Sequence, residues 1–272
     1  MKIHFRKMAG AGNDFIVIDN RDGIIPEPDR RHVFEAWCRR RVGIGADGVL
    51  LVEPARGGCH FRMRYYNADG GEAESCGNGA RCIARFAHLI GAAPEQVRFE
   101  TAAGIYQAFV GADDVLLSMS DPHGLRRAVR LEIPDLFSGS VDFINTGVPH
   151  AVLRVEDLEA AAVVALGRAI RRHEAFAPAG ANANFIRPRA DGGLDIRTYE
   201  RGVEDETLAC GTGSVAAALI ANLGGHGQSP VAVHTRGGSI LRIHFEREGE
   251  HFHQIKLEGE ARVVYEGVVE LA

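Results

Sequence analysis

The sequence predicts an α+β protein built from two similar lobes, and three observations support this prediction. The chain has 272 residues, which is long for one compact core and suits two domains of about 130 residues each. The motif Cys-Gly-x-Gly occurs twice, beginning at Cys76 and at Cys210. Each copy is followed at once by an apolar run of helical length and is flanked by short segments that alternate as strands do.

The surroundings of the two motifs also repeat. Thr101 follows Cys76 by 25 residues, Thr235 follows Cys210 by 25 residues, and a glycine comes three residues after each threonine. Two further segments recur upstream in the same order: Arg64-x-Tyr66 with Arg197-x-Tyr199, and Gly12-Asn13-Asp14-Phe15 with Gly147-Val148-Pro149-His150. This ordered recurrence indicates a duplicated domain. We place the first lobe at residues 1–119 plus 259–272 and the second at residues 120–258.

Local patterns give the elements of the first lobe. Residues 2–8 and 15–19 read as strands around a glycine-rich turn, and Pro28-Asp29 opens a helix of about a dozen residues. The first motif leads into a buried helix that stops at Gly91. Further strands are expected at 49–52, 61–66, 97–101, 105–110 and 114–119.

The second lobe restarts at residue 141. A strand at 151–155 is followed by a helix from about Glu156 to Arg172. The second motif leads into a buried helix that stops near Gly224. Further strands are expected near 184–187, 194–199, 231–235, 239–246, 252–258 and 261–269.

Composition excludes several classes of function. The net charge is −5, and basic and acidic residues are mixed along the chain, so the sequence lacks the excess of positive charge that nucleic-acid binding requires. No apolar run approaches the roughly 18 residues of a membrane helix, and the first residues lack a signal-peptide core. Five cysteines are too few and too scattered for a disulfide framework. We therefore expect a cytoplasmic protein that binds a small molecule and neither nucleic acid nor membrane.

The two motif cysteines indicate proton transfer. The unpaired N–H groups and the dipole of a helix N-terminus favour negative charge, so they favour a thiolate there. Two such groups, presented by similar lobes to opposite faces of one carbon, could invert a stereocentre: one removes a proton and the other delivers one. Backbone N–H groups at the two helix starts (Gly77, Asn78, Gly211 and Thr212) would stabilise the resulting carbanion through its carboxylate. This chemistry needs no pyridoxal phosphate.

The chain resembles the diaminopimelate epimerase family from Met8 to its final strands. The matching segments are Asn67-Ala68-Asp69-Gly70, Ser75 to Cys82, Tyr199-Glu200-Arg201-Gly202, Ala209 to Gly213, Gly12 to Phe15, Gly43 to Asp47, and Gly147 to His150. The resemblance implies interconversion of LL- and meso-2,6-diaminopimelate without cofactor or metal, for lysine and bacterial cell-wall synthesis. It also implies a homodimer and a fold in which each lobe is a curved, mostly antiparallel sheet wrapped around a central helix.

The resemblance further implies roles for particular residues. Cys76 and Cys210 would be the catalytic pair. The distal, non-inverted end of the substrate would be held by Asn13, Asn67, Asn182, Glu200 and Arg201. The reacting carboxylate would be held by Gly77, Asn78, Gly211 and Thr212. His150 and Glu200 would adjust the protonation of the cysteines.

Two alternatives remain open at this point. Val148 and Gly48 replace an asparagine and a glutamine found in some family members, which leaves room for a racemase of another amino acid, such as histidine. A non-catalytic amino-acid-binding protein with a redox-active cysteine pair is the second alternative. Of the remaining cysteines, Cys38 and Cys59 have no partner at metal-binding spacing, and we interpret Cys82 as a core residue.

Overall fold

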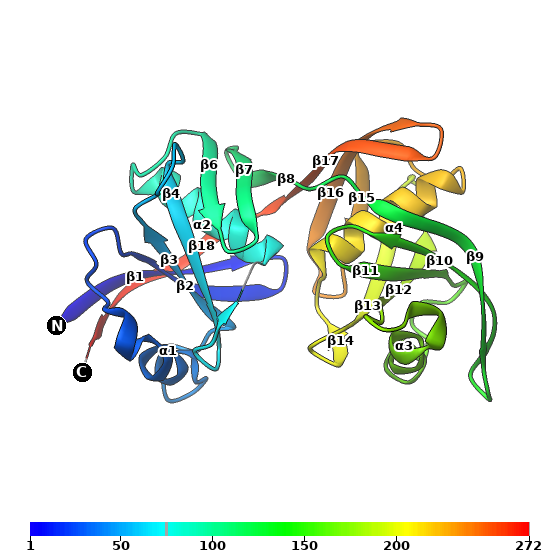
Figure 1. Ribbon diagram of the computed structural model, residues 1–272, viewed down its shortest axis with the longest axis horizontal. Helices are drawn as coiled ribbons and strands as arrows, with labels where there is room; N and C mark the ends of the chain where they lie inside the picture. The colour runs from blue at the N-terminus through cyan, green and yellow to red at the C-terminus, as the bar shows by residue number, and fades with distance from the viewer. Residues whose placement is uncertain (74–75, 272) are drawn as a thin grey trace. The chain divides into compact units, whose positions relative to one another are not determined.

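The structure is a computed structural model that describes residues 1–73 and 76–271. The chain divides into two compact units, Met1–Ser118 with Gly259–Ala272, and Met119–Glu258 (Figure 1). Each unit combines β-strands with a few helices, as the sequence predicts. Among the described residues, no helix is long and apolar enough to cross a membrane.

The first unit is a mixed, mostly antiparallel sheet. Its strands are β1 (Lys2–Gly10), β2 (Asn13–Asp19), β3 (Gly48–Glu53), β4 (Phe61–Asn67), β5 (Glu72–Ala73), β6 (Gln96–Thr101), β7 (Gly104–Val110), β8 (Asp114–Ser118) and β18 (Arg262–Glu270). Its helices are η1 (Glu27–Asp29), α1 (Arg30–Cys38) and α2 (Gly77–Leu89). The pairs β2–β3 and β4–β6 are parallel, and the other pairs, β18–β1, β1–β2, β3–β4, β4–β5, β6–β7 and β7–β8, are antiparallel.

The second unit has the same composition of elements. Its strands are β9 (His123–Ile133), β10 (Phe137–Asn145), β11 (Pro149–Arg154), β12 (Asn182–Pro188), β13 (Leu194–Glu200), β14 (Asp205–Thr207), β15 (Val231–His234), β16 (Ile240–Glu248) and β17 (His251–Glu260). Its helices are α3 (Val163–Arg172), η2 (Glu174–Phe176) and α4 (Gly211–Leu223).

Strand pairing repeats between the units. In the first unit the strands pair in the order β1–β2–β3–β4–β6–β7–β8. The six successive pairs are antiparallel, parallel, antiparallel, parallel, antiparallel and antiparallel. In the second unit the chain β10–β11–β12–β13–β15–β16–β17 gives the same series. Because α2 and α4 occupy the same step of the series, the structure supports a duplicated domain.

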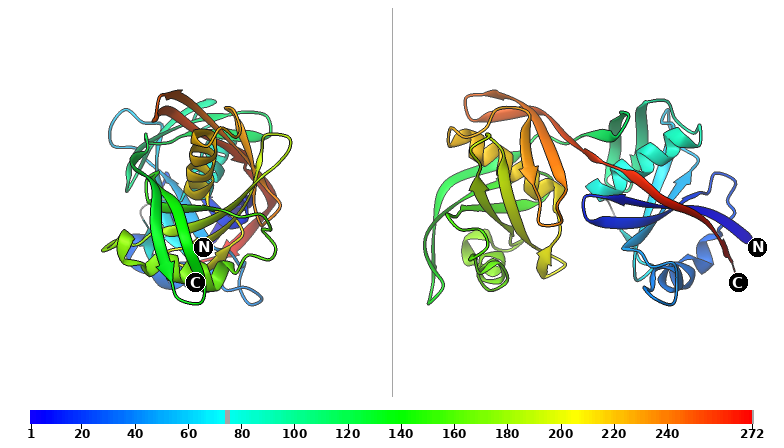
Figure 2. Two further views of the ribbon diagram at one scale, coloured as in Figure 1. Left: turned by 90° about the vertical axis from the view of Figure 1, so that its right-hand side faces the viewer. Right: turned by 180° about the vertical axis from the view of Figure 1, so that it is seen from behind.

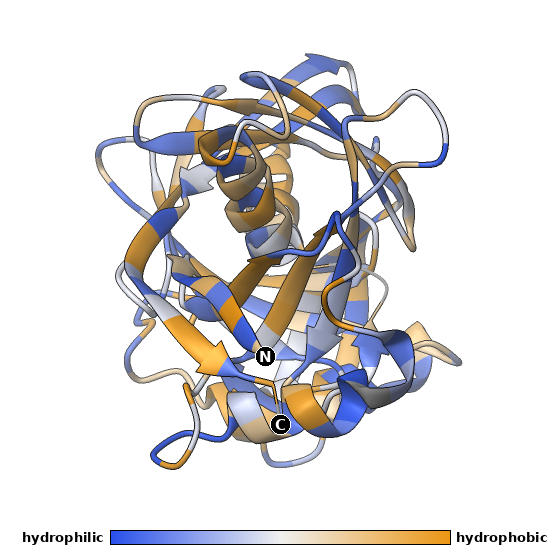
Figure 3. Cartoon of the chain, turned by 90° about the vertical axis from the view of Figure 1, so that its left-hand side faces the viewer, coloured by the Kyte–Doolittle hydropathy of each residue, from blue (hydrophilic) through white to orange (hydrophobic). Residues whose placement is uncertain are grey.

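The two motif helices form the centre of their units. Nine of the 13 residues of α2 and nine of the 13 residues of α4 are buried, because these helices are apolar on more than one face. Strands surround α4 in both views of Figure 2. Figure 3 shows many hydrophobic residues on the helix at the centre, with some hydrophilic ones among them, and many hydrophilic residues in the surrounding loops. Each helix start is therefore fixed by packing along the whole helix behind it.

The helix predicted from Glu156 is wrong in its first half, because α3 begins only at Val163. The carboxylate of Asp157 accepts hydrogen bonds from the backbone N–H groups of Glu159 (2.9 Å) and Ala160 (3.1 Å). An aspartate that bonds the backbone two and three residues on stabilises a turn in place of a helix.

Candidate functional site

Cys76 is the N-cap residue of α2. Its backbone is extended (φ −149°, ψ 120°), its Sγ accepts a hydrogen bond from the Gly79 N–H at 3.5 Å, and its carbonyl accepts from the Ala80 N–H at 2.7 Å. The sulfur thus lies against the first turn, where the unpaired N–H groups favour an anion. Ser75, which directly precedes the first motif, lies outside the described residues.

Cys210 occupies the same position on α4. Its backbone is extended (φ −125°, ψ 112°), and its Sγ is 3.6 Å from the Thr212 Oγ1. Its carbonyl accepts from both the N–H and the hydroxyl of Ser214, at 2.9 and 3.0 Å. The side chain is nearly buried, with 8% of the residue exposed. Each unit therefore places one sulfur at the N-terminus of its central helix.

The side chains of Asn13 and Asn78 meet beside the first motif. The Asn78 Nδ2 donates to the Asn13 Oδ1 at 2.8 Å, and the Asn13 Nδ2 donates to the Asp47 Oδ2 at 2.9 Å. The glycine-rich turn after β1 thereby reaches the first turn of α2. The turn and the loop that carries Asp47, which are separate motifs in the sequence, form one polar cluster.

Arg81 belongs to the same cluster and was not identified from the sequence. Its guanidinium is fully buried and donates to the Asn78 Oδ1 at 2.8 Å, while its Nε has no hydrogen-bond partner among the described residues. Burial holds the pKa of this group below its ordinary value. A positive charge inside an apolar helix is costly, and the only sequence signal for it is an arginine within the run that follows Cys76.

Asn67 is exposed at the end of β4 and pairs in register with Gly48 of β3. A Cβ at Gly48 would lie 2.4 Å from the Tyr66 carbonyl oxygen and 2.8 Å from the Tyr65 Cε2. The backbone of β4 therefore fills the space that a side chain at position 48 needs. The absence of glutamine at this position has a packing cause in this chain.

We expect the substitution Gly48→Gln to destabilise the protein by about 1–3 kcal/mol, because the β3–β4 pair leaves no space for a side chain at this position. Thermal unfolding of this variant beside Gly48→Ala tests the packing cause, since both share the Cβ and should lose similar stability. A Gly48→Gln protein as stable as the wild type would contradict it.

Asn182 and Arg201 lie together in the second unit. The Asn182 Oδ1 accepts from the Arg201 backbone N–H at 2.7 Å, and its Nδ2 donates to the Pro149 carbonyl at 3.1 Å. The Arg201 guanidinium donates to the Ala179 carbonyl at 2.9 Å. Burial raises the pKa of the neighbouring Glu200 carboxyl, which favours its protonated form.

His150 lies behind the second motif in a buried polar cluster. Its imidazole is fully buried, and the Asn184 Nδ2 lies 3.1 Å from its Nδ1. The hydroxyl of Thr146 donates to the Thr212 carbonyl at 2.9 Å, which ties the β10–β11 turn to the first turn of α4. Burial lowers the pKa of His150 to about 3, and the positive charge of Arg201 acts in the same direction.

This pKa predicts a pH dependence of stability. In the unfolded chain a histidine titrates near pH 6.5, so between about pH 6.5 and 3 the unfolded state binds one more proton at His150 than the folded state does. The free energy of unfolding should therefore fall as pH falls, with His150 contributing about 1.4 kcal/mol per pH unit. Denaturant unfolding of the wild type and of His150→Gln measures this contribution, and equal slopes in that window would contradict it.

Comparison with known proteins identifies the family. The family model described as diaminopimelate epimerase matches residues 5–123 and 143–264. The chain belongs to the diaminopimelate epimerase family. The diaminopimelate epimerase of Chlorobaculum tepidum is 44% identical over 97% of this chain and 100% of its own length. That of Aquifex aeolicus is 42% identical over 97% of each chain.

Solved structures show the same fold at low sequence identity. A phenazine biosynthesis protein from Bacillus anthracis matches with a TM-score of 0.71 at 16% identity, covering 100% of both chains. A hydroxyproline epimerase from Agrobacterium vitis matches with a TM-score of 0.70 at 17% identity, covering 98% of this chain and 91% of the other. The two-lobed fold is therefore shared beyond the diaminopimelate epimerase family.

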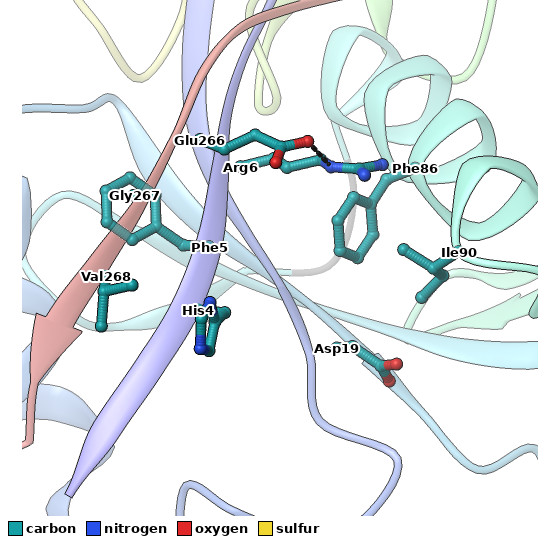
Figure 4. Close-up of a pocket in the computed structure, with 9 residues that line it drawn as sticks. All are labelled: His4, Phe5, Arg6, Asp19, Phe86, Ile90, Glu266, Gly267 and Val268. Atoms are coloured by element: carbon teal, nitrogen blue, oxygen red, sulfur yellow. Dashed lines mark hydrogen bonds and ion pairs between the residues drawn. The ribbon is translucent and has the colours of Figure 1, made fainter.

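A surface groove of about 370 Å³ lies elsewhere in the first unit (Figure 4). Between its walls, Arg6 pairs with Glu266 at 2.6 Å and stacks over Phe86 at 5.6 Å from the ring centroid. None of the family's motif residues lines it. Among the described residues, no group of three or more histidine, cysteine or acidic side chains is arranged to hold a metal ion.

Proposed function

We propose that this protein is an isomerase that interconverts LL- and meso-2,6-diaminopimelate, and that it supplies precursors for lysine and peptidoglycan. Membership of the diaminopimelate epimerase family over nearly the whole chain supports this activity. The observation that carries the mechanism is the repeated placement of one cysteine at the N-cap of each central helix.

The proposed reaction is a proton relay between two thiols. The thiolate of one cysteine takes the α-proton, and the carbanion then takes a proton from the thiol of the other cysteine on the opposite face. Charge balances at each step, because one thiolate is consumed and the other is formed. Cys76 and Cys210 exchange the roles of base and acid when the reaction runs backwards.

The helix starts supply the charge stabilisation that this relay needs. Removing a proton next to a carboxylate concentrates negative charge on its oxygens, and backbone N–H groups at a helix N-terminus are preorganised donors for such charge. We assign this role to Gly77 and Asn78 on α2 and to Gly211 and Thr212 on α4. No step of this relay calls for a cofactor.

We assign recognition of the distal amino-acid end to Asn13, Asn67, Asn182, Glu200 and Arg201. Together these residues offer amide, carboxyl and guanidinium groups, which can bind an ammonium and a carboxylate. The hydrogen bond between the Asn182 side chain and the Arg201 backbone supports a shared role for these two residues.

The decisive assay compares substrates. The purified protein should epimerise diaminopimelate with a kcat/KM at least about 10³-fold higher than for histidine or any other single amino acid, because only diaminopimelate has a second amino-acid head to fill the distal contacts. Faster turnover of a single amino acid would favour the racemase alternative, which the replacement at Val148 motivates. Binding of diaminopimelate without exchange of its α-proton would favour the non-catalytic alternative.

We further propose a homodimer that works in the cytoplasm, where thiols stay reduced. Strand β18, which pairs with β1, supports the dimer, because its Val264 and Val268 are 48% and 50% exposed. Light scattering should give twice the mass of 29.4 kDa, and the double substitution Val264→Lys and Val268→Lys should return the mass to that of one chain. A monomeric wild-type protein would contradict the dimer.

A further inference from the structure

Asn184 uses both of its side-chain N–H groups and its side-chain oxygen in hydrogen-bond contacts inside the second unit. It lies on β12, opposite Thr198 of β13 in register, and is 1% exposed. Its Nδ2 lies 3.0 Å from the Ala151 carbonyl oxygen and 3.1 Å from the His150 Nδ1, and its Oδ1 accepts from the Thr198 hydroxyl at 3.0 Å.

These contacts fix the orientation of the amide. A backbone carbonyl can only accept a hydrogen bond, so the NH₂ end of Asn184 must face Ala151. The second hydrogen of that NH₂ group then points at the imidazole. The His150 Nδ1 must accept it and cannot carry a proton, because a protonated Nδ1 would set donor against donor.

The tautomer follows from this constraint. A neutral imidazole without a proton on Nδ1 carries its proton on Nε2. The imidazolium form is excluded by the same donor conflict and by full burial. His150 therefore has one hydrogen-bond donor to offer, the Nε2–H.

That donor has no partner among the described residues, and the Nε2 atom is buried from solvent. Burying a donor without a partner is costly, and a ligand or reacting group that completes the bond is one reason for a folded protein to keep such a donor. The Nε2–H is directional and preorganised, which is what stabilisation of a developing anion requires.

The cluster is built into the first turn of α4. A Cβ at Gly213 would lie 2.4 Å from the Asn184 Oδ1 and 3.3 Å from the Cys210 Sγ. The amide that orients His150 therefore packs directly against the turn that follows Cys210. The position of Asn184 is fixed from both sides, by two strands and by the helix start.

We propose that Asn184 is a positioning residue that holds His150 as its Nε2–H tautomer, so that His150 serves the reaction as a hydrogen-bond donor to an anion and not as a base. The inference rests on the proposed epimerase function for its catalytic meaning. The anion it predicts is one that the relay produces, a thiolate or the carboxylate of the deprotonated substrate.

Nitrogen NMR of the wild-type protein tests the tautomer without substrate. The signals of His150 are those that disappear in His150→Gln. We expect the Nδ1 shift of an unprotonated nitrogen and the Nε2 shift of a protonated one, constant from about pH 5 to 9. Asn184→Asp, which replaces the donor by an acceptor, should move the proton to Nδ1. A proton on Nδ1 in the wild type, or titration near neutral pH, would overturn the proposal whatever the substrate is.

Kinetics of paired variants test the role. Glutamine places an N–H near the position of Nε2 but cannot act as a base near neutral pH, whereas leucine offers neither function. We expect His150→Gln to lower kcat by about tenfold or less and His150→Leu to lower it by about 100-fold, the effect of one hydrogen bond to a charged group. Equal, large losses in both folded variants would assign His150 the role of base and overturn the proposal.

Discussion

Replacing Cys76 by alanine is expected to lower kcat for epimerisation by about 10²–10⁴-fold, the usual contribution of a positioned acid or base. The loss should be similar for Cys210→Ala, because each sulfur acts once in every turnover. Serine at either position should not restore the rate, since its hydroxyl ionises far above neutral pH. Initial rates with LL- and with meso-diaminopimelate measure the effect.

Cys82 provides the matched control. It lies on α2, six residues after Cys76, and burial raises the pKa of its thiol to about 12, so it stays protonated. Its sulfur packs against Gly10, since a Cβ added at Gly10 would lie 3.1 Å from the Cys82 Sγ. Cys82→Ala should therefore leave kcat within about threefold while lowering stability slightly. A Cys76→Ala enzyme with wild-type rates would remove the basis of the proposed relay.

Replacing Gly213 by alanine is expected to destabilise the protein by about 1–3 kcal/mol and to lower kcat by at least about tenfold. In the middle of a helix, alanine is normally favoured over glycine by about 1 kcal/mol. Here its methyl group would collide with the Asn184 Oδ1 at 2.4 Å and press on Cys210. The collision would displace both the thiol and the amide that orients His150.

The equivalent position on α2 gives the control. The atoms nearest to a Cβ at Gly79 would be the Leu50 Cδ2 at 3.3 Å and the Phe15 Cζ and Cys76 Cβ at 3.5 Å, so none would be as close as the 2.4 Å contact at Gly213. These neighbours can shift by a few tenths of an ångström, so Gly79→Ala should stay within about 1 kcal/mol of the wild-type stability. Thermal unfolding and kcat of both variants test the difference. A Gly213→Ala protein that matches Gly79→Ala in both measurements would refute it.

The central helices and most strands can be predicted from the sequence, because these elements depend on local pattern. Both motif helices are apolar around most of their circumference and end beside a glycine, and the flanking strands alternate clearly. Strand β9 was missed because its residues are mostly exposed and Ala128 interrupts it in the left-handed region (φ 52°). No apolar alternation marks such a strand.

The contacts among the polar groups behind the cysteines were beyond the reach of sequence patterns, although Asn13, Asn78 and His150 were themselves expected in the site. Asn184 reaches His150 across 34 positions of the chain, and Asn78 reaches Asn13 across 65. Neither asparagine differs in the sequence from a solvent-exposed one, since their contacts arise only when strands pair and helices pack. For the same reason Arg81 could not be distinguished from a surface arginine on a helix.

The most direct test of the two-thiol relay follows deuterium during the first few per cent of reaction in heavy water. Starting from LL-diaminopimelate, the meso product should carry deuterium at the inverted carbon while the remaining LL substrate does not. The reason is that the proton is removed by one sulfur and replaced by the other. Equal early labelling of substrate and product would show that a single base serves both faces, and would contradict the account.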